Sequence, residues 1–188
     1  AINNKAQVLK DLKKFDEALT FVNQQIDEKS SFVLQKTKVD VLLESIDLKQ
    51  AYRLNEQLLK IYPEDINLLN YKGVIYERNS QYQYKKKYLE LAYEAFNIAR
   101  TKNPKFILAI GNQIVCLINN GQYDIAEIMI NEGFSQDASD PFLLHHKSKI
   151  EMLKGNLSIA LNFIDKALKK VSLAEFLLTK CDILIKLR

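Results

Sequence analysis

The most constraining feature of this chain is an alanine that recurs at a nearly constant spacing. A bulky apolar residue stands three positions before each of these alanines. Successive intervals are 33, 41, 34 and 34 residues by subtraction, and 41 equals 34 plus 7. A fixed period in this range is typical of proteins built from stacked supersecondary units, none of which can bury its apolar face alone. The five alanines are Ala18, Ala51, Ala92, Ala126 and Ala160.

The composition indicates that these units are made of helices. Of the 188 residues, 47% are hydrophobic and 27% are charged, which gives enough apolar surface for a folded core. The chain has only 5 Gly and 3 Pro, and a strand-rich fold needs more turn residues than that. Apolar residues three and four positions apart would form one buried stripe per helix, and an alanine at each crossing would let two helices approach closely. We therefore expect an all-α fold.

The repeat resembles the tetratricopeptide repeat (TPR), a helix–turn–helix unit with a period of 34 residues. The first two repeats are degenerate, with Asn55 at an aromatic position and Ser30 at a proline position. The resemblance covers nearly the whole chain and implies a right-handed superhelical solenoid of about five TPR-like repeats, followed by an unpaired C-terminal helix. The third repeat matches best, through Leu69, Gly73, Tyr76, Ala92, Phe96, Ala99 and Pro104.

We expect one domain over residues 1–188. Residues 1–12 correspond to most of a first helix, with Ile2, Ala6 and Leu9 at the packing positions, so we expect the stack to start earlier in the natural protein. The final helix is more apolar than a solvent-facing cap, through residues such as Leu178 and Ile185, and we expect a further helix or a second copy of the chain to cover it. The expected repeats span 1–30, 31–63, 64–104, 105–138 and 139–171, with a seven-residue insertion near 79–88 and the final helix at 172–188.

In TPR proteins the first helix of each repeat lines a concave groove. Amide side chains there offer both donors and acceptors, so they can hold the backbone of an extended peptide without reading its sequence. The positions that correspond to groove positions of the family are Asn3, Asn4, Gln7, Gln35, Lys36, Asn70, Tyr71, Asn112, Val115, His145, His146 and Lys149.

Some TPR proteins grip the terminal carboxylate of a partner with Lys and Asn one turn apart on a first helix. This chain lacks that combination, so binding of the acidic C-termini of chaperones is disfavoured. The residues at the corresponding pairs of positions are Asn3 with Gln7, Gln35 with Val39, Asn70 with Val74, and His145 with Lys149.

The insertion is rich in tyrosine and lysine and contains no Gly or Pro, so we expect it to lengthen both helices of the third repeat by about a turn. Tyrosine is favoured in protein interfaces and lysine attracts acidic surfaces, so this projection is a second expected contact. The alternatives are a solvated knob that packs on Arg78 and Tyr93, and a surface that stacks on nucleic acid. The expected contact residues are Tyr82, Tyr84, Lys85, Lys86 and Lys87.

No motif for catalysis, metal or cofactor binding stands out. His145 and His146 are adjacent, so on a helix they point about 100° apart and cannot bind one metal ion together. Cys116 lies in an apolar run, and its spacing from Cys181 fits neither a disulfide framework nor a zinc site. We therefore expect a protein that is not an enzyme.

The expected function is a protein-interaction scaffold that binds a peptide or a partner domain in the groove. The alternative is a regulatory or targeting TPR domain of a larger enzyme or effector. A net charge of +4 is too small to indicate nucleic acid or an acidic membrane, and the groove lacks the basic stripe of RNA-binding repeats. No apolar run approaches the roughly 18 residues of a membrane span. We expect a cytoplasmic location.

Overall fold

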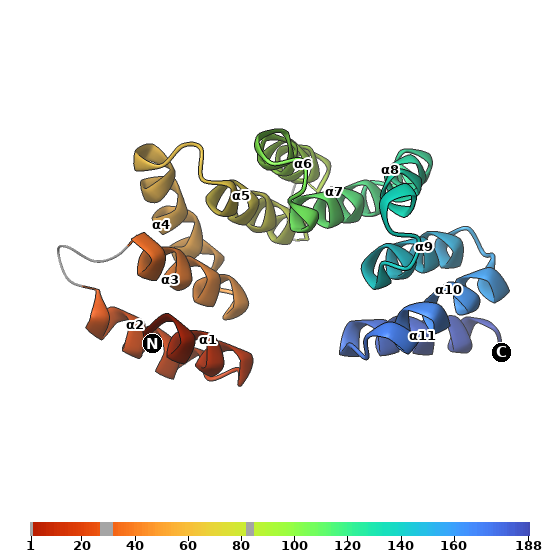
Figure 1. The fold of residues 1–188 in the computed structure, drawn as a ribbon, viewed down its shortest axis with the longest axis horizontal. Coiled ribbons are helices and arrows are strands. Elements are labelled where there is room, and N and C mark those ends of the chain that lie inside the picture. Colours follow the sequence, from red (N-terminus) through yellow and green to blue (C-terminus); the bar gives the residue numbers. More distant parts are fainter. Residues whose placement is uncertain (1, 27–31, 82–84) are drawn as a thin grey trace. The chain divides into compact units, whose positions relative to one another are not determined.

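A computed structural model describes residues 2–26, 32–81 and 85–188, which contain eleven helices and no strand (Figure 1). The chain divides into two compact units, Ala1–Ala109 and Ile110–Arg188. The helices are α1 (Ile2–Asp11), α2 (Phe15–Gln25), α3 (Phe32–Glu44), α4 (Leu48–Ile61), α5 (Ile66–Asn79), α6 (Lys85–Lys102), α7 (Ile107–Asn119), α8 (Tyr123–Gln136), α9 (Pro141–Leu153), α10 (Leu157–Lys170) and α11 (Ala174–Lys186).

The recurring alanines are fully buried, as the repeat pattern predicts. All five have no exposed surface, and all lie on the second helix of a pair. Four of them lie in the first turn of that helix, whereas Ala92 lies further along α6. The third pair shows how close the helices come, because a methyl group added at Gly73 on α5 would lie 2.4 Å from Cε1 of Phe96 on α6. A small residue on one helix thus accommodates a large residue on its partner.

Aspartate side chains cap the start of three helices, and prolines follow the end of two. The carboxylates of Asp47, Asp65 and Asp140 accept hydrogen bonds from the first backbone amides of α4, α5 and α9. Pro63 and Pro104 each follow the end of a second helix by two residues, where a proline cannot continue the helix.

Unit 1 is a stack of helix pairs. The second helix of each pair packs on its own first helix and on the first helix of the next pair, from α1 to α6. The first helices also contact one another, α1 with α3 and α3 with α5. The seven extra residues of the third repeat appear mainly in α6, which has 18 residues against 14 in α4, whereas α5 is not lengthened to a similar degree.

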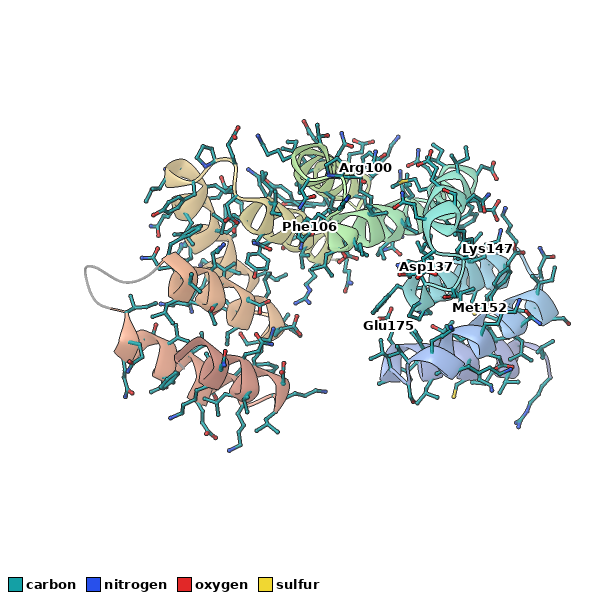
Figure 2. The ribbon with its side chains drawn as sticks, in the orientation of Figure 1. Arg100, Phe106, Asp137, Lys147, Met152 and Glu175 are labelled. Atoms are coloured by element: carbon teal, nitrogen blue, oxygen red, sulfur yellow. The ribbon has the colours of Figure 1, made fainter. Side chains whose placement is uncertain are left out.

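Unit 2 ends in a core shared by α9, α10 and α11. Its buried members include Leu144, Ile164 and Phe176, and Met152 packs against them from α9 (Figure 2). The outer face of α11 is apolar and exposed, so the expected surplus of apolar residues on the final helix is present. Its exposed members are Leu177, Leu178, Leu184 and Ile185.

Candidate functional site

The first helices of unit 1 present polar side chains outside the core. Asn4 and Gln7 are exposed on α1, Gln35 and Lys36 are half-buried on α3, and Tyr71 is half-buried on α5. The side chain of Asn3, a sixth expected groove residue, lies outside the described part of the chain. We call Asn4, Gln7, Gln35, Lys36 and Tyr71 the first-helix surface.

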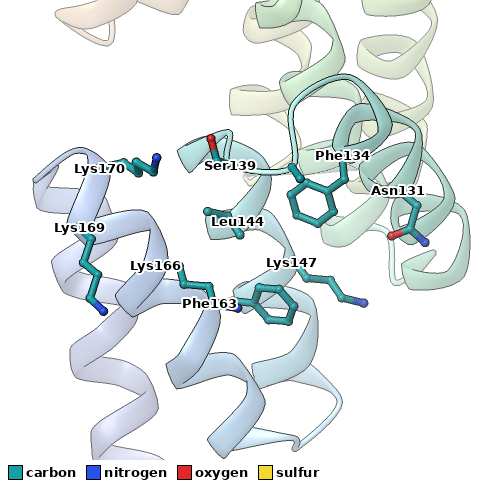
Figure 3. Close-up of a pocket in the computed structure, with 10 residues that line it drawn as sticks. Asn131, Phe134, Ser139, Leu144, Lys147, Phe163, Lys166, Lys169 and Lys170 are labelled. Carbon is teal, nitrogen blue, oxygen red and sulfur yellow. The ribbon is translucent and has the colours of Figure 1, made fainter.

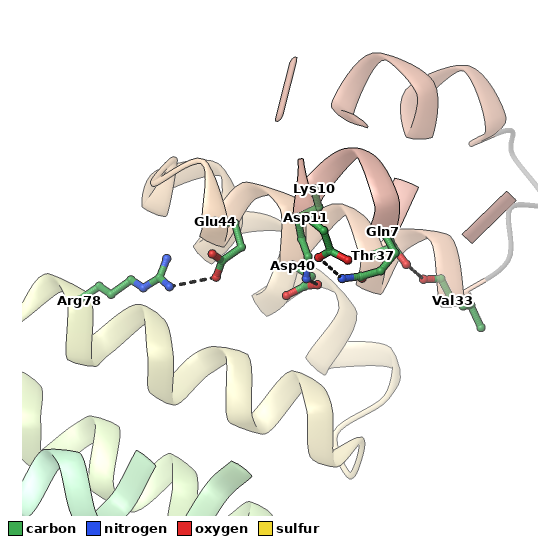
Figure 4. A network of polar contacts seen from close by, with 8 residues as sticks. All are labelled: Gln7, Lys10, Asp11, Val33, Thr37, Asp40, Glu44 and Arg78. Carbon is green, nitrogen blue, oxygen red and sulfur yellow. Dashed lines mark hydrogen bonds and ion pairs between the residues drawn. The ribbon is translucent and has the colours of Figure 1, made fainter. Parts of the chain in front are cut away.

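Ion pairs join neighbouring first helices at this surface. Lys10 Nζ on α1 lies 2.5 Å from Asp40 Oδ2 on α3 (Figure 4). Lys36 Nζ on α3 lies 2.9 Å from Oδ2 of Asp65, which caps α5. These side chains are largely shielded from water, so the pairs are less screened than ordinary surface pairs and hold the helices in register.

The polar network continues along the same helices. Arg78 on α5 donates a hydrogen bond to the carboxylate of Glu44 on α3 (Figure 4). It also donates to the carbonyl oxygen of Leu43. On α1, the Gln7 amide donates to Asp11 at 2.9 Å and stays within its own helix. The charged groups named here are therefore occupied in holding the helices of unit 1 together, whereas the exposed Gln7 amide is bonded only within α1.

Tyr71 adds a hydroxyl donor to this surface. Burial, and then the negative charges of Asp40 and Asp65, raise the pKa of the Tyr71 phenol well above its ordinary value. The phenol therefore stays protonated at any physiological pH. It can donate one hydrogen bond to a carbonyl of a bound chain.

Three of the expected groove residues are buried. Asn70, His145 and His146 are exposed by only 6%, 1% and 7%. His145 Nε2 lies 2.9 Å from Oγ1 of Thr179 on α11, and its ring lies 4.5 Å from that of Phe176. These side chains lie on helix faces that neighbouring helices cover, so they pack between helices.

The remaining groove positions of unit 2 are half-buried. They are Asn112 and Val115 on α7 and Lys149 on α9. Lys149 is close enough to both histidines for its charge to lower their pKa values. The sequence pattern predicted the helices that carry these residues, but it did not predict which side chains a third helix would cover.

The insertion is described only in part. Tyr82 and Tyr84 lie outside the described residues, while Lys85, Lys86 and Lys87 form the exposed first turn of α6. The ring of Tyr76 on α5 lies 6.1 Å from that of Tyr88 and 6.4 Å from that of Tyr52.

A cavity of about 500 Å³ in unit 2 was not anticipated (Figure 3). The only sequence signal is a run of lysines at the end of α10, at a spacing that places them near one another on a helix. The apolar pattern of α10 predicted packing positions only, so the sequence did not predict the cavity. The cavity is lined by Asn131, Phe134, Ala138, Ser139, Leu144, Lys147, Phe163, Lys166, Lys169 and Lys170.

Within residues 2–26, 32–81 and 85–188, no cluster of His, Cys, Asp and Glu is arranged to hold a metal ion. Cys116 is buried and Cys181 is exposed, and neither forms a disulfide within the described residues. None of the helices described is both long enough and apolar enough to cross a membrane.

Solved structures resemble this chain over nearly its full length. The thermophilic TPR protein TTC0263 of Thermus thermophilus aligns over 97% of this chain and 96% of its own, with a TM-score of 0.84 and 18% sequence identity. This chain has the TPR fold. The eleven helices and the buried alanines are the structural counterpart of the repeat pattern in the sequence.

Two further TPR-like neighbours show the same likeness. PilW, a widely conserved type IV pilus biogenesis factor, covers 98% of this chain and 84% of its own, with a TM-score of 0.73 and 17% identity. YrrB, a TPR protein with an unusual peptide-binding site, covers 95% and 89%, with a TM-score of 0.59 and 20% identity. No protein-family model and no curated protein matches the sequence.

Proposed function

We propose that this TPR chain is a non-catalytic scaffold whose first-helix surface binds an extended peptide segment of a partner protein. The TPR fold supports an interaction role in general, and one protein of this fold, YrrB, has a peptide-binding site. The assignment of peptide binding to the first-helix surface depends on the side chains of unit 1.

The proposal rests on where the polar side chains of the first helices lie. The crossing alanines are fully buried, whereas Asn4, Gln7, Gln35 and Tyr71 stay outside the core on three first helices that contact in succession. Amide and phenol groups spaced along such a row can pair with the backbone of an extended chain. The lysines and aspartates beside them are joined in ion pairs, so the row favours backbone recognition over recognition of charge.

The two histidines do not support a catalytic role. Both are buried, and burial lowers their pKa values to about 4 for His145 and about 3 for His146, so they are neutral at pH 7. The first-helix surface itself carries amides, a protonated phenol and a paired lysine, none of which is poised to transfer a proton near neutral pH.

The test uses peptides selected on the whole chain from a display library of random sequences. We expect the triple variant Gln7→Ala, Gln35→Ala, Tyr71→Phe to weaken the binding of the selected peptides at least about tenfold, because each change removes one hydrogen-bonding group worth roughly 1 kcal/mol. Fluorescence anisotropy measures the change.

The matched control changes three exposed residues of the second helices, Gln24→Ala, Arg53→Ala and Lys60→Ala. It should leave the affinity within about twofold, because peripheral side chains contribute little. Selected peptides that bind both triple variants equally would show that the first-helix surface is not the site.

A further inference from the structure

The cavity in unit 2 is formed by other helices than the first-helix surface and differs from it in chemistry. Its floor is apolar and is formed by Phe134 on α8, Leu144 on α9 and Phe163 on α10 (Figure 3). Leu144 is buried, while the two phenylalanines are half-buried and reach the surface. A cavity of about 500 Å³ with such a floor has the size and character of a site that takes up an apolar group.

The rim of the cavity is basic on one side. Lys166, Lys169 and Lys170 project from the last turns of α10, at relative positions i, i+3 and i+4, so their side chains are neighbours. All three are exposed, and in the described part of the chain none of them forms an ion pair with a carboxylate. They are therefore available to an anionic ligand.

The fourth lysine of the cavity is already occupied. Lys147 Nζ lies 2.9 Å from Glu127 and 3.0 Å from Glu151, so its charge is balanced inside the protein. The acidic residue beside the rim is Asp137, whose carboxylate accepts hydrogen bonds from the backbone and hydroxyl of Ser139 at 2.8 and 2.9 Å. Three lysines against one aspartate leave the rim positive.

A stabilising role at the end of α10 explains part of this arrangement, because lysines offset the negative end of a helix dipole. That role does not require a hollow lined by two phenylalanines next to the lysines. The three lysine charges are also spread over more than a full turn of α10. Several carboxylates along a peptide match this spacing better than the single headgroup of a fatty acid or lipid does.

We propose that this cavity is a second docking site, which binds an acidic peptide segment of a partner protein. One aromatic or aliphatic side chain of the peptide enters the hollow against Phe134, Leu144 and Phe163, and neighbouring carboxylates pair with Lys166, Lys169 and Lys170. This site does not depend on the first-helix surface, so either proposal can be wrong without affecting the other.

The test uses the full chain and a labelled synthetic peptide with one phenylalanine flanked on each side by aspartate and glutamate. We expect Lys166→Gln, Lys169→Gln, Lys170→Gln to weaken binding about tenfold or more, since three exposed ion pairs are lost together. The matched control, Lys49→Gln, Lys60→Gln, Lys105→Gln, removes the same number of exposed charges from unit 1 and should change the affinity by less than about twofold.

The apolar contact is tested on the peptide, because Phe163→Ala would also disturb the core of unit 2. Replacing the peptide phenylalanine by alanine should weaken binding about tenfold, the effect of losing one buried aromatic side chain. A neutral peptide with asparagine and glutamine in place of the acids should bind as weakly.

Three results would overturn the proposal. One is equal loss of binding in the two lysine variants, which would indicate attraction to net charge alone. Another is no measurable binding of the acidic peptide at millimolar concentration. The third is binding of phosphatidylserine vesicles through Lys166, Lys169 and Lys170 without binding of the peptide, which would assign the rim to a membrane surface.

Discussion

Single residues show how the repeat pattern tolerates departures from its consensus. Asn55 occupies a position where the family has an aromatic residue, and it is fully buried, with its amide donating to the carbonyl oxygen of Leu68 at 3.1 Å. Ser148 on α9 similarly donates to the carbonyl oxygen of Ala160 at 2.7 Å. A buried polar side chain is accepted at these positions because it bonds to the backbone of the helix it packs against.

The turns inside the repeats share a residue with positive φ, five positions before the crossing alanine. Gly121 and Gly155 have φ of 75° and 83°, and Lys13 and Ile46 have φ of 58° and 63°. Glycine adopts this conformation freely, whereas a β-branched residue is strained in it. Ile46 is also exposed, so it gains little from burial.

We therefore expect Ile46→Gly to stabilise unit 1 by about 1 kcal/mol, since the relief of left-handed strain exceeds the entropy that glycine adds to the unfolded chain. Urea unfolding measures the change as a higher midpoint at constant slope. Lys49→Gly, inside α4, should lower the midpoint instead. A lower midpoint for Ile46→Gly would contradict the strain argument.

The close approach at Gly73 gives a second prediction. Gly73→Ala should destabilise the protein by roughly 1–3 kcal/mol, because the new methyl group would overlap the Phe96 ring between α5 and α6. Thermal unfolding monitored by circular dichroism measures the loss.

Gly111→Ala is the matched control, because its methyl group would lie 3.7 Å from Nε2 of His146, an ordinary contact. Alanine also favours a helix over glycine, so this change should be neutral or stabilising. Equal destabilisation by both changes would mean that loss of the glycine itself, and not the overlap with Phe96, is responsible.

At the scale of elements, α9 is held to its neighbours by two neutral histidines. Burial, and then the charge of Lys149, lower the pKa of His145 to about 4; burial, His145 and Lys149 lower that of His146 to about 3. The carboxylate of Glu175 lies 3.8 Å from Nδ1 of His145, but it is largely exposed to water and does not offset the burial.

The protein should therefore lose stability as the pH falls. Below the ordinary histidine pKa of about 6.5, both histidines are protonated in the unfolded chain but stay neutral in the folded chain. The free energy of unfolding therefore decreases as the pH falls from about 6.5 towards 4. We expect the melting temperature to be lower at pH 5 than at pH 7.5. The variant His145→Gln, His146→Gln should lose most of this dependence, and an unchanged pH dependence in that variant would contradict the assignment.

The sequence allowed more to be predicted about elements than about surfaces. The alanine period and the proline positions predicted the helix pairs, because close crossing requires small residues and a proline ends a helix. The groove residues depend on packing that is remote in sequence. His145 is covered by α11, which follows a whole helix later in the chain, and the cavity beside α10 needs three helices and a turn to form.

At the scale of the whole chain, two compact units carry two different candidate surfaces. Unit 1 offers a row of amides and a phenol beside paired charges. Unit 2 offers an apolar hollow beside lysines that form no ion pair with any carboxylate that the structure describes. The central claim is that the repeats close through buried alanines and leave the first-helix surface for a partner chain.

Photo-crosslinking tests this claim most directly. The photoreactive residue p-benzoylphenylalanine is placed at Gln35 on α3 in one variant and at Arg53 on α4 in another, and each is irradiated with a peptide selected on the native chain. We expect a crosslinked product from position 35 and little from position 53. Crosslinking from position 53 alone, with none from position 35, would show that the first-helix surface is not the binding site.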